Sequence, residues 1–459
     1  MARPGDGISP ARREAYAILL RLERDDTHSD DLLRGRRVSA LSEQDRNLCT
    51  ALVMGVLRRQ LQLDAAIRPL LARPKRRLDA EVEIALRLGA FQLMHLDRVP
   101  SHAAIGESVA LARAAGHRFA SGMVNAVLRK LAARPRNLDA AGKASTAAQV
   151  AVLTGHPPWM VERWADFYRL EAAERICEYG QIEPQLCVRL ISGEVEAELA
   201  CEGLELEVGA ILTSARRVVW GDVAATAAFR EGQVRIQEEG SQLIAELAGQ
   251  GTQILDCCAA PGGKTLILAE RNPEAEVTAW EISVPRFEAM RTRVAESAFA
   301  GRIEVMHMDA AAERGEGEYD LVLADAPCSG TGTLARNPEI RHRLKVEDLA
   351  RHHERQCAIL RGALRAAGQS GARVLYSTCS LEPEENEQVV VEVLADSPEW
   401  GRVSMGERVE ALRSEGQLMP DVSTLLQRCV NAEGSLSLLP GRAGLATDGF
   451  FAAMLERQG

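Results

Sequence analysis

Long hydrophobic segments are missing from this 459-residue sequence: no apolar run approaches the roughly 20 residues of a membrane-spanning helix, and the N-terminus lacks a secretion signal. Cysteine is scarce, because the ten cysteines are too few for a disulfide-supported fold. None of them forms a Cys-x-x-Cys pair or a Cys/His cluster with zinc spacing. We therefore expect a cytoplasmic protein with free thiols, no metal and no membrane contact.

Lysine is nearly absent from the first 140 residues. That stretch holds 24 basic residues against 16 acidic ones, a net charge of +8, and only Lys75 and Lys130 are lysines. The remainder holds 31 basic against 49 acidic residues, a net charge of −18. Arginine presents a planar donor fork that suits phosphates and stacks on bases. The asymmetry indicates a nucleic-acid-binding segment joined to a catalytic domain, although a genome rich in guanine and cytosine would also favour arginine over lysine.

Apolar periodicity divides the chain into three parts, since 459 residues are too many for one core. Residues 1–140 have the period of amphipathic helices, which predicts an all-α bundle. Residues 141–232 begin with a polar linker and continue as a small α+β module. Residues 233–459 alternate strands with helices, which is typical of an α/β domain with a parallel sheet covered on both faces. The expected strands are Gln253–Cys258, Glu276–Glu281, Ile303–Met308, Asp320–Ala324 and Arg373–Ser377.

A loop of small residues follows the first of these strands and precedes a helix: Asp256-Cys-Cys-Ala-Ala-Pro-Gly-Gly-Lys-Thr265. Paired glycines let the backbone approach a ligand closely, and the helix N-terminus offers oriented N–H groups. Glu281 and Asp309 end the next two strands, where a carboxylate can accept hydrogen bonds from ribose hydroxyls or an adenine amino group. Together these features predict a pocket for an adenosine-containing cofactor.

The same loop invites comparison with a phosphate-binding P-loop, which would make the protein a nucleotide triphosphatase. That motif requires a glycine six residues before its lysine, and Cys258 occupies this position before Lys264. Asp325, at the end of a hydrophobic strand, could imitate the magnesium-binding acid of such enzymes. The missing glycine makes this the less favoured alternative.

Two cysteines stand on polar turns directly after strands. Asp325 and Cys328 follow the fourth strand, and Cys379 follows the fifth. If the two strands are neighbours about 4.8 Å apart, both thiols face one cavity. A reducing compartment disfavours a disulfide, and the ligands are too few for a metal site.

A thiolate, an acid and an adenosine-type cofactor together suit the methylation of cytosine at carbon 5. Addition of a thiolate to carbon 6 makes carbon 5 nucleophilic toward a methyl group, and an acid can hold the base. The cofactor for this chemistry is S-adenosyl-L-methionine. The residues alone do not decide which thiol is the nucleophile, because either position is chemically reasonable.

At these motifs the sequence resembles the Fmu/Sun family of RNA cytosine-5 methyltransferases. The matching stretches are Asp256–Thr265, Asp325–Gly330 and Tyr376–Ser380. Residues 100–131 resemble the NusB-like RNA-binding bundle of the branch that modifies small-subunit ribosomal RNA. The resemblance implies a NusB-like domain over residues 1–140, an RRM-like module over 141–232 and a Rossmann-like class I methyltransferase domain over 233–459.

The resemblance also implies a role for each site residue. Cys379 would be the nucleophile, Cys328 would assist product release, Asp325 would contact the target cytosine, and Lys264 would line the site beside it. The implied substrate is 16S rRNA, free or in an assembly intermediate, and we expect the protein to act as a monomer. The residues expected to hold the cofactor are Cys258, Ala259, Ala260, Pro261, Gly262, Gly263, Lys264, Glu281, Asp309 and Asp325.

A cationic segment, residues 336–345, comes shortly after the turn that carries Cys328. We expect Arg336, Arg341 and Arg343 to meet RNA phosphates near the target base, which must leave its stack to enter the pocket. A solvated charged turn is the alternative for this segment. For the whole chain, a non-enzymatic RNA-binding assembly factor is a further alternative, and the intact acid and thiols count against it.

Overall fold

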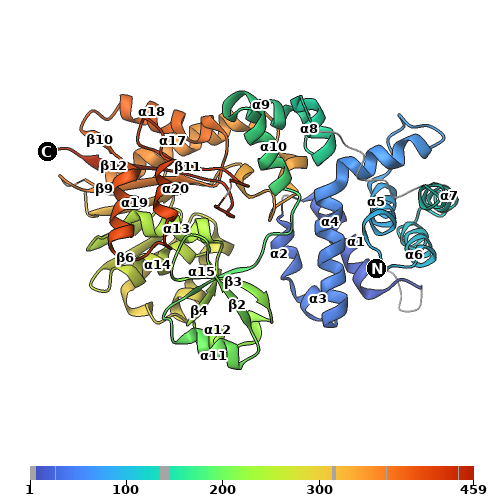
Figure 1. Ribbon diagram of the computed structural model, residues 1–459, viewed down its shortest axis with the longest axis horizontal. Helices are drawn as coiled ribbons and strands as arrows, with labels where there is room; N and C mark the ends of the chain where they lie inside the picture. The colour runs from blue at the N-terminus through green and yellow to red at the C-terminus, as the bar shows by residue number, and fades with distance from the viewer. Residues whose placement is uncertain (1–6, 26, 135–143, 313–316, 369, 443) are drawn as a thin grey trace. The chain divides into compact units, whose positions relative to one another are not determined.

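The computed structural model describes residues 7–25, 27–134, 144–312, 317–368, 370–442 and 444–459 (Figure 1). The chain forms two compact units. One unit combines Met1–Ile182 with Leu334–Arg343, and the other combines Glu183–Thr333 with Leu344–Gly459. A short segment from late in the sequence therefore belongs to the N-terminal unit. None of the helices in the described ranges is long and apolar enough to span a membrane.

Every regular element that the structure describes in the first unit is a helix. Its centre is the long helix α4 (Glu43–Ile67), which packs against α1 (Pro10–Arg24) and α5 (Ala80–His95). The core of this unit includes the apolar face of α1, at Ala15, Ile18, Leu19 and Leu22, which agrees with the amphipathic period of residues 1–140. The other helices are α2 (Ser29–Leu33), α3 (Arg36–Ser39), η1 (Arg68–Leu70), α6 (Ser101–Ala114), α7 (Ser121–Ala132), α8 (Ala147–Thr154), α9 (Pro158–Tyr168), α10 (Leu170–Tyr179) and α16 (Ile340–Arg343).

Helices α8, α9 and α10 lie in the first unit, where α8 packs against α4. They were predicted to form one module with the strands that follow, over residues 141–232. In the structure α8, α9 and α10 lie in a different unit from the strands of that stretch, because these three helices pack against one another and against α4. The division into three domains stays a prediction.

A small antiparallel sheet opens the second unit, with the strand order β2-β3-β1-β4. Its core contains Val188, Leu199 and Val234. The strands are β1 (Cys187–Leu190), β2 (Glu205–Val208), β3 (Ala215–Trp220) and β4 (Val234–Ile236), and the helices beside them are α11 (Val195–Cys201), η2 (Val223–Ala225) and α12 (Ala227–Arg230).

The large sheet of the second unit has the order β10-β12-β9-β8-β5-β6-β7, with β11 paired to β12. The strands from β9 to β7 are parallel, and β12 is antiparallel to β9. The five predicted strands are confirmed, and this α/β architecture is the predicted one. The strands are β5 (Gln253–Asp256), β6 (Glu276–Trp280), β7 (Ile303–Met306), β8 (Leu321–Asp325), β9 (Arg373–Thr378), β10 (Trp400–Val403), β11 (Leu436–Leu438) and β12 (Phe450–Arg457).

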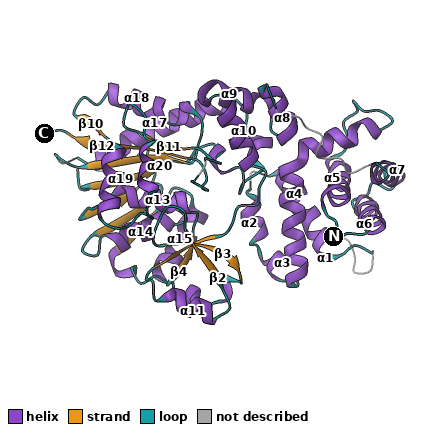
Figure 2. Cartoon of the chain, viewed as in Figure 1, coloured by secondary structure: helices purple, strands orange, loops and turns teal. Residues whose placement is uncertain are grey.

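Helices cover both faces of this sheet (Figure 2). Ile254 of β5 packs in one core cluster with residues of α13, α14 and α15, whereas its neighbour Leu255 packs in the other cluster with residues of α17 and α18. Consecutive strand residues point to opposite faces, so an uninterrupted apolar run is what such a strand requires. The helices are α13 (Glu239–Ala248), α14 (Gly263–Arg271), α15 (Val284–Ala295), η3 (Ala300–Arg302), η4 (Thr331–Thr333), α17 (Asp348–Ala366), η5 (Pro383–Glu385), α18 (Glu387–Ala395), α19 (Met405–Ser414) and α20 (Val422–Gln427).

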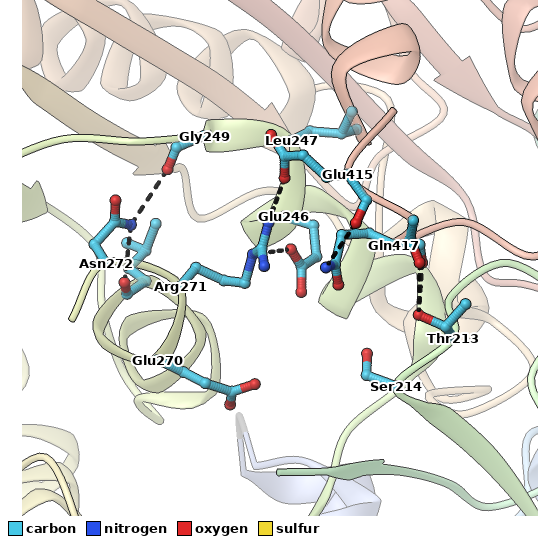
Figure 3. A network of polar contacts seen from close by, with 12 residues as sticks. Thr213, Ser214, Glu246, Leu247, Gly249, Glu270, Arg271, Asn272, Glu415 and Gln417 are labelled. Carbon is cyan, nitrogen blue, oxygen red and sulfur yellow. Dashed lines mark hydrogen bonds and ion pairs between the residues drawn. The ribbon is translucent and has the colours of Figure 1, made fainter. Parts of the chain in front are cut away.

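A buried ionic cluster joins the small sheet to the large one. Arg189 of β1 is 1% exposed and reaches Glu246 of α13 at 2.6 Å and Glu270 of α14 at 2.8 Å. Arg271 pairs with the same Glu246 at 2.8 Å, and Figure 3 shows these two side chains facing each other. Because α14 starts directly after the loop that follows β5, this cluster fixes the helix next to that loop.

Candidate active site

Asp325 ends β8 and is held through both of its carboxylate oxygens. The Lys264 ammonium lies 2.6 Å from Oδ2. The Ser377 hydroxyl, from the neighbouring strand β9, donates to Oδ1 at 2.8 Å, and Ser377 is also the register partner of Asp325. Burial alone would lower the pKa of Lys264, but the charge and hydrogen bond of Asp325, with the nearby Cys379, raise it. The pair is therefore a fixed ammonium–carboxylate unit at the end of the sheet.

The two thiols meet where the neighbouring parallel strands β8 and β9 end. The Sγ atoms of Cys328 and Cys379 are 3.3 Å apart, and both residues are half-buried. A disulfide would bring the sulfurs to about 2.05 Å, so this separation is that of a hydrogen bond between free thiols. The prediction that both thiols face one space is confirmed in its geometry.

The Cys328 thiol is held in its protonated form by its surroundings. The hydrogen bond to Cys379, followed by burial, raises the pKa of the Cys328 thiol well above its ordinary value. Cys328 therefore stays protonated near neutral pH and can donate its S–H to the sulfur of Cys379. The roles of the two thiols, which the residues alone left open, stay a prediction.

The cofactor loop closes one side of a cavity of about 100 Å³. Gly262 has a φ of +93°, a conformation that glycine adopts readily, and it starts α14 directly beside the cavity. The Ala260 and Pro261 carbonyls accept hydrogen bonds from Arg286 at 2.5 Å and from Arg293 at 3.2 Å, so helix α15 holds the loop. The residues that line the cavity are Ile236, Gln237, Ser241, Asp256, Cys258, Ala259, Ala260, Pro261, Gly263, Lys264, Arg293 and Asp325.

Two buried polar groups in this lining suit a ligand that has hydrogen-bond donors and a positive charge. The Oε1 atom of Gln237 is buried and has no hydrogen-bond partner among the described residues. Asp256 accepts a hydrogen bond from the Thr265 hydroxyl at 2.7 Å, but complete burial, with the charge of Asp325, raises its pKa to about 7. An adenosine-type cofactor with an ammonium group fits this set of acceptors. Gln237 was missed, since it lies before the first strand of the large sheet.

Glu281 directly follows β6, as predicted, whereas Asp309 comes three residues after the end of β7, and neither belongs to the described lining of that cavity. Glu281 is 4% exposed and accepts a hydrogen bond from the Ser283 backbone N–H at 2.7 Å. Asp309 accepts from the Ala311 N–H and from Arg355, both at 3.1 Å. Their position along the same edge of the sheet agrees with the predicted pocket, and their contact with a cofactor stays a prediction.

Residues 336–343 of the segment that was expected to meet RNA phosphates belong to the first unit. Arg341 is 1% exposed, and its guanidinium donates to the carbonyls of Gly180 at 2.9 Å and of Leu334 at 3.3 Å. Burial lowers the pKa of Arg341 to about 9. This arginine has no free face for a phosphate, so the expectation for Arg341 is wrong. The alternative of a solvated turn is equally wrong for it.

Arg343 is half-buried and donates to the carbonyls of Thr27 at 2.5 Å and Asp25 at 3.1 Å. Arg336 is half-buried too, and its contact with RNA, like that of Arg343, stays a prediction. A run of basic residues cannot show that backbone carbonyls of distant helices are their partners, which is why the sequence misled for Arg341.

Glu385 is a site residue that the sequence analysis missed. It is fully buried, and its carboxylate accepts from the Ser329 backbone N–H at 2.7 Å and from Gln356 Nε2 at 3.0 Å. The hydroxyls of Ser329 and Ser380 donate to its other oxygen. These serines directly follow Cys328 and Cys379, so one carboxylate ties the two thiol-bearing turns together. Glu385 lies in a run of acidic residues, a composition typical of an exposed surface turn, so the sequence did not indicate that it is buried.

Comparison with known proteins matches residues 245–456 to the family described as 16S rRNA methyltransferase RsmB/F, and residues 9–133 to the NusB family. The chain is 31% identical over 461 residues to the probable ribosomal RNA small subunit methyltransferase B of Bacillus subtilis, covering 97% of this chain and 98% of that one. It is 32% identical over 365 residues to the ribosomal RNA small subunit methyltransferase B of Pseudomonas syringae, covering 77% and 79%.

Solved structures share the fold. The crystal structure of PH0851 superposes with a TM-score of 0.78 at 22% identity, covering 100% of both chains. The structure of NSun6 from Pyrococcus horikoshii with SFG gives a TM-score of 0.52 at 18% identity, covering 65% of this chain and 97% of that one. At such identities the likeness concerns the fold alone.

Proposed function

The chain belongs to the RsmB/F family of 16S rRNA methyltransferases, and from that premise we propose that it methylates carbon 5 of a cytosine in small-subunit rRNA. The observation that carries the proposal is the thiol pair of Cys328 and Cys379, with its sulfurs 3.3 Å apart, beside the Lys264–Asp325 pair. A single thiol could be a buried apolar group, whereas two hydrogen-bonded thiols next to a fixed carboxylate form a reaction site.

Cys379 attacks the cytosine. Its thiolate adds to carbon 6, which forms a covalent S–C bond and moves electron density to carbon 5. When bound, S-adenosyl-L-methionine supplies the electrophilic methyl group that carbon 5 takes. A base then takes the carbon-5 proton, the bond between carbon 6 and sulfur breaks with its electron pair going to Cys379, and the aromatic ring is restored. We assign assistance in this release to Cys328, the other thiol of the pair.

Asp325 holds the base during these steps. Lys264 and Ser377 each use one of its oxygens, and a carboxylate has further lone pairs for the amino group of a cytosine. The Lys264 ammonium lies 2.6 Å from Asp325 and adds positive charge next to Cys379. The triphosphatase alternative loses support here, because Lys264 is already paired with Asp325 rather than presented to a phosphate.

The cofactor would be held by the loop after β5. Its backbone approaches closely at Gly262 and Gly263, and the unpaired oxygen of Gln237 faces the same cavity. Cys258, Ala259, Ala260 and Pro261 complete the loop, and we keep Glu281 and Asp309 as partners for the ribose and the adenine.

RNA recognition would begin with the basic first unit. Residues 9–133 match the NusB family, and the net charge of +8 over residues 1–140 favours phosphate contact. Arg336 and Arg343 remain candidates for such contacts. We propose a monomer that acts in the cytoplasm on 16S rRNA or on a partly assembled small subunit.

The test is methylation of unmodified small-subunit rRNA with tritiated S-adenosylmethionine. We expect the wild-type protein to label cytosine, Cys379→Ala to be inactive, and Cys328→Ala to accumulate a covalent protein–RNA adduct. Cys201→Ser, which changes an exposed thiol outside the site, is the matched control and should stay active. An adduct in Cys379→Ala and none in Cys328→Ala would reverse the two roles, and an unlabelled RNA with wild-type protein would refute the proposal.

A further inference from the structure

A second group of reactive side chains lies on the helices that cover the sheet, away from the thiol pair. His353 and Cys357 are one turn apart on α17, and Glu392 of α18 faces them. His353 Nε2 is 2.8 Å from a Glu392 carboxylate oxygen and 3.6 Å from Cys357 Sγ. The three ligand atoms all lie within 4.8 Å of one another.

The imidazole of His353 is already oriented for a ligand at Nε2. Its Nδ1 lies 2.6 Å from the backbone carbonyl of Glu384, an oxygen that can only accept, so Nδ1 carries a proton. In the neutral ring Nε2 is then an acceptor that points at another acceptor, the Glu392 carboxylate. A positive centre must sit between them, either a second proton or a metal ion. Carbonyl partners on the remote nitrogen are characteristic of metal-bound histidines.

The distances fit a tetrahedral ion of the zinc class. Bonds of about 2.0 Å to nitrogen and about 2.3 Å to sulfur place these two atoms about 3.5 Å apart in tetrahedral geometry. The observed separation of Nε2 and Sγ is 3.6 Å. The nitrogen and oxygen, now hydrogen-bonded at 2.8 Å, would have to separate to about 3.3 Å. The Glu392 side chain is 49% exposed, so it is free to make this adjustment.

We propose that His353, Cys357 and Glu392 bind one zinc-class divalent cation, with water as the fourth ligand. The charges balance, because the thiolate and the carboxylate neutralise the ion and the imidazole stays neutral. Binding replaces the thiol proton of Cys357, which passes to the solvent. Arg361 lies 3.1 Å from the other oxygen of Glu392 and 3.1 Å from Asp396, so it would hold the ligating carboxylate in place.

The ion would link α17 to α18 through the turn that carries Glu385. The carbonyl that orients His353 belongs to Glu384, the residue directly before Glu385. A metal at His353 would therefore restrain the short helix η5, and with it the carboxylate that joins the two thiol-bearing turns. This inference does not depend on the proposed RNA substrate, and its test requires no methylation.

Cobalt(II) is the probe for the experiment, since a thiolate bound to Co²⁺ gives an intense charge-transfer absorption. Reduced, metal-free full-length protein is titrated with Co²⁺ and then with Zn²⁺. We expect the wild-type band to saturate at one equivalent and to disappear on addition of Zn²⁺. Cys357→Ser and His353→Gln should abolish the band, and Glu392→Gln, a change of a half-exposed side chain, should weaken Co²⁺ binding at least tenfold.

His352→Gln and Cys379→Ala are the matched controls and should keep the band. They exclude the neighbouring imidazole and the thiol pair of the reaction site as the source of the signal. A band that is absent from the wild type would overturn the proposal. So would a band that persists in Cys357→Ser and is lost in Cys379→Ala. Thermal denaturation of each variant without metal separates loss of a ligand from loss of the fold.

Discussion

Replacing Glu385 with glutamine tests whether one buried carboxylate holds the two thiol-bearing turns in register. One oxygen of Glu385 accepts from the Ser329 N–H and from Gln356, and the other accepts from two serine hydroxyls. A glutamine carbonyl can still accept from the two N–H groups, and the hydroxyls can rotate to accept from its amide. The substitution therefore removes the charge on four hydrogen bonds while it keeps the shape of the side chain.

The expected cost follows from the strength of those bonds. A hydrogen bond to a charged group contributes about 1.5–3 kcal/mol and a neutral one about 1 kcal/mol, so four bonds lose about 2–8 kcal/mol of unfolding free energy. A catalytic group displaced by about 1 Å costs about 100-fold in rate, and we expect kcat of Glu385→Gln to fall between about 10- and 100-fold. The cofactor cavity follows β5 and does not include Glu385, so cofactor affinity should stay within about twofold.

The assay combines urea denaturation, steady-state methylation at saturating cofactor and RNA, and calorimetric binding of S-adenosylmethionine. Glu384→Gln, the neighbouring acid, is the matched control, because it is the backbone carbonyl of Glu384 that orients His353. An unchanged kcat in a folded Glu385→Gln protein would refute the reasoning. An equal loss of cofactor binding would show that the effect is a general disturbance of the domain rather than a displacement of the thiols.

Three further predictions concern buried charges. The pKa of Asp256 is raised from 3.8 to about 7, so its protonated form stabilises the fold at low pH, and that contribution is lost as pH rises from about 4 to about 7. In urea denaturation at several pH values, Asp256→Asn should lose this dependence of the unfolding free energy on pH. The same dependence in both proteins would contradict the prediction. Arg341→Met should lower stability by about 2–4 kcal/mol in thermal unfolding and leave the salt dependence of RNA binding unchanged. If the slope of log K against log salt concentration were reduced by about 0.7, Arg341 would contact an RNA phosphate and the prediction would be wrong. Arg189→Met leaves Glu246 and Glu270 with fewer compensating charges and should cost about 3–5 kcal/mol in denaturant unfolding. Adding Glu246→Gln should recover part of that loss. A double variant that loses more stability than the two single variants together would exclude charge imbalance as the cause.

Local sequence patterns predicted what depends on local structure. The apolar strands and the loops at their carboxyl ends follow from neighbouring residues, so the positions of Cys328, Cys379 and Asp325 could be foreseen. The close approach of the two thiols required only that β8 and β9 be neighbours, a common arrangement in such sheets. The raised pKa of the Cys328 thiol could not be foreseen, because it depends on the hydrogen bond to Cys379 and on burial.

Contacts between distant segments were the part that the sequence could not reveal. Arg341 finds its acceptors at the end of α10, 161 residues away, and no charge pattern encodes that partner. Glu385 belongs to an acidic run with the composition of a surface turn, so its burial and its contacts with the thiol-bearing turns could not be predicted. The pair His353 and Cys357 has helical spacing, but Glu392 lies 35 residues beyond Cys357 and becomes a neighbour only when α17 packs against α18.

The first unit is synthesised in two steps, because its segment 334–343 is translated long after the rest of it. Glu339 accepts from the Ser29 backbone N–H at 3.0 Å, and Arg341 caps the end of α10, so the N-terminal bundle lacks these groups until the segment leaves the ribosome. A translation rate of about 5–20 residues per second puts about 8–30 s between the emergence of Ile182 and that of Arg343. A gene fragment that ends at Ile182 should accordingly yield an incomplete bundle. A fragment to which residues 334–343 are joined should form the complete bundle.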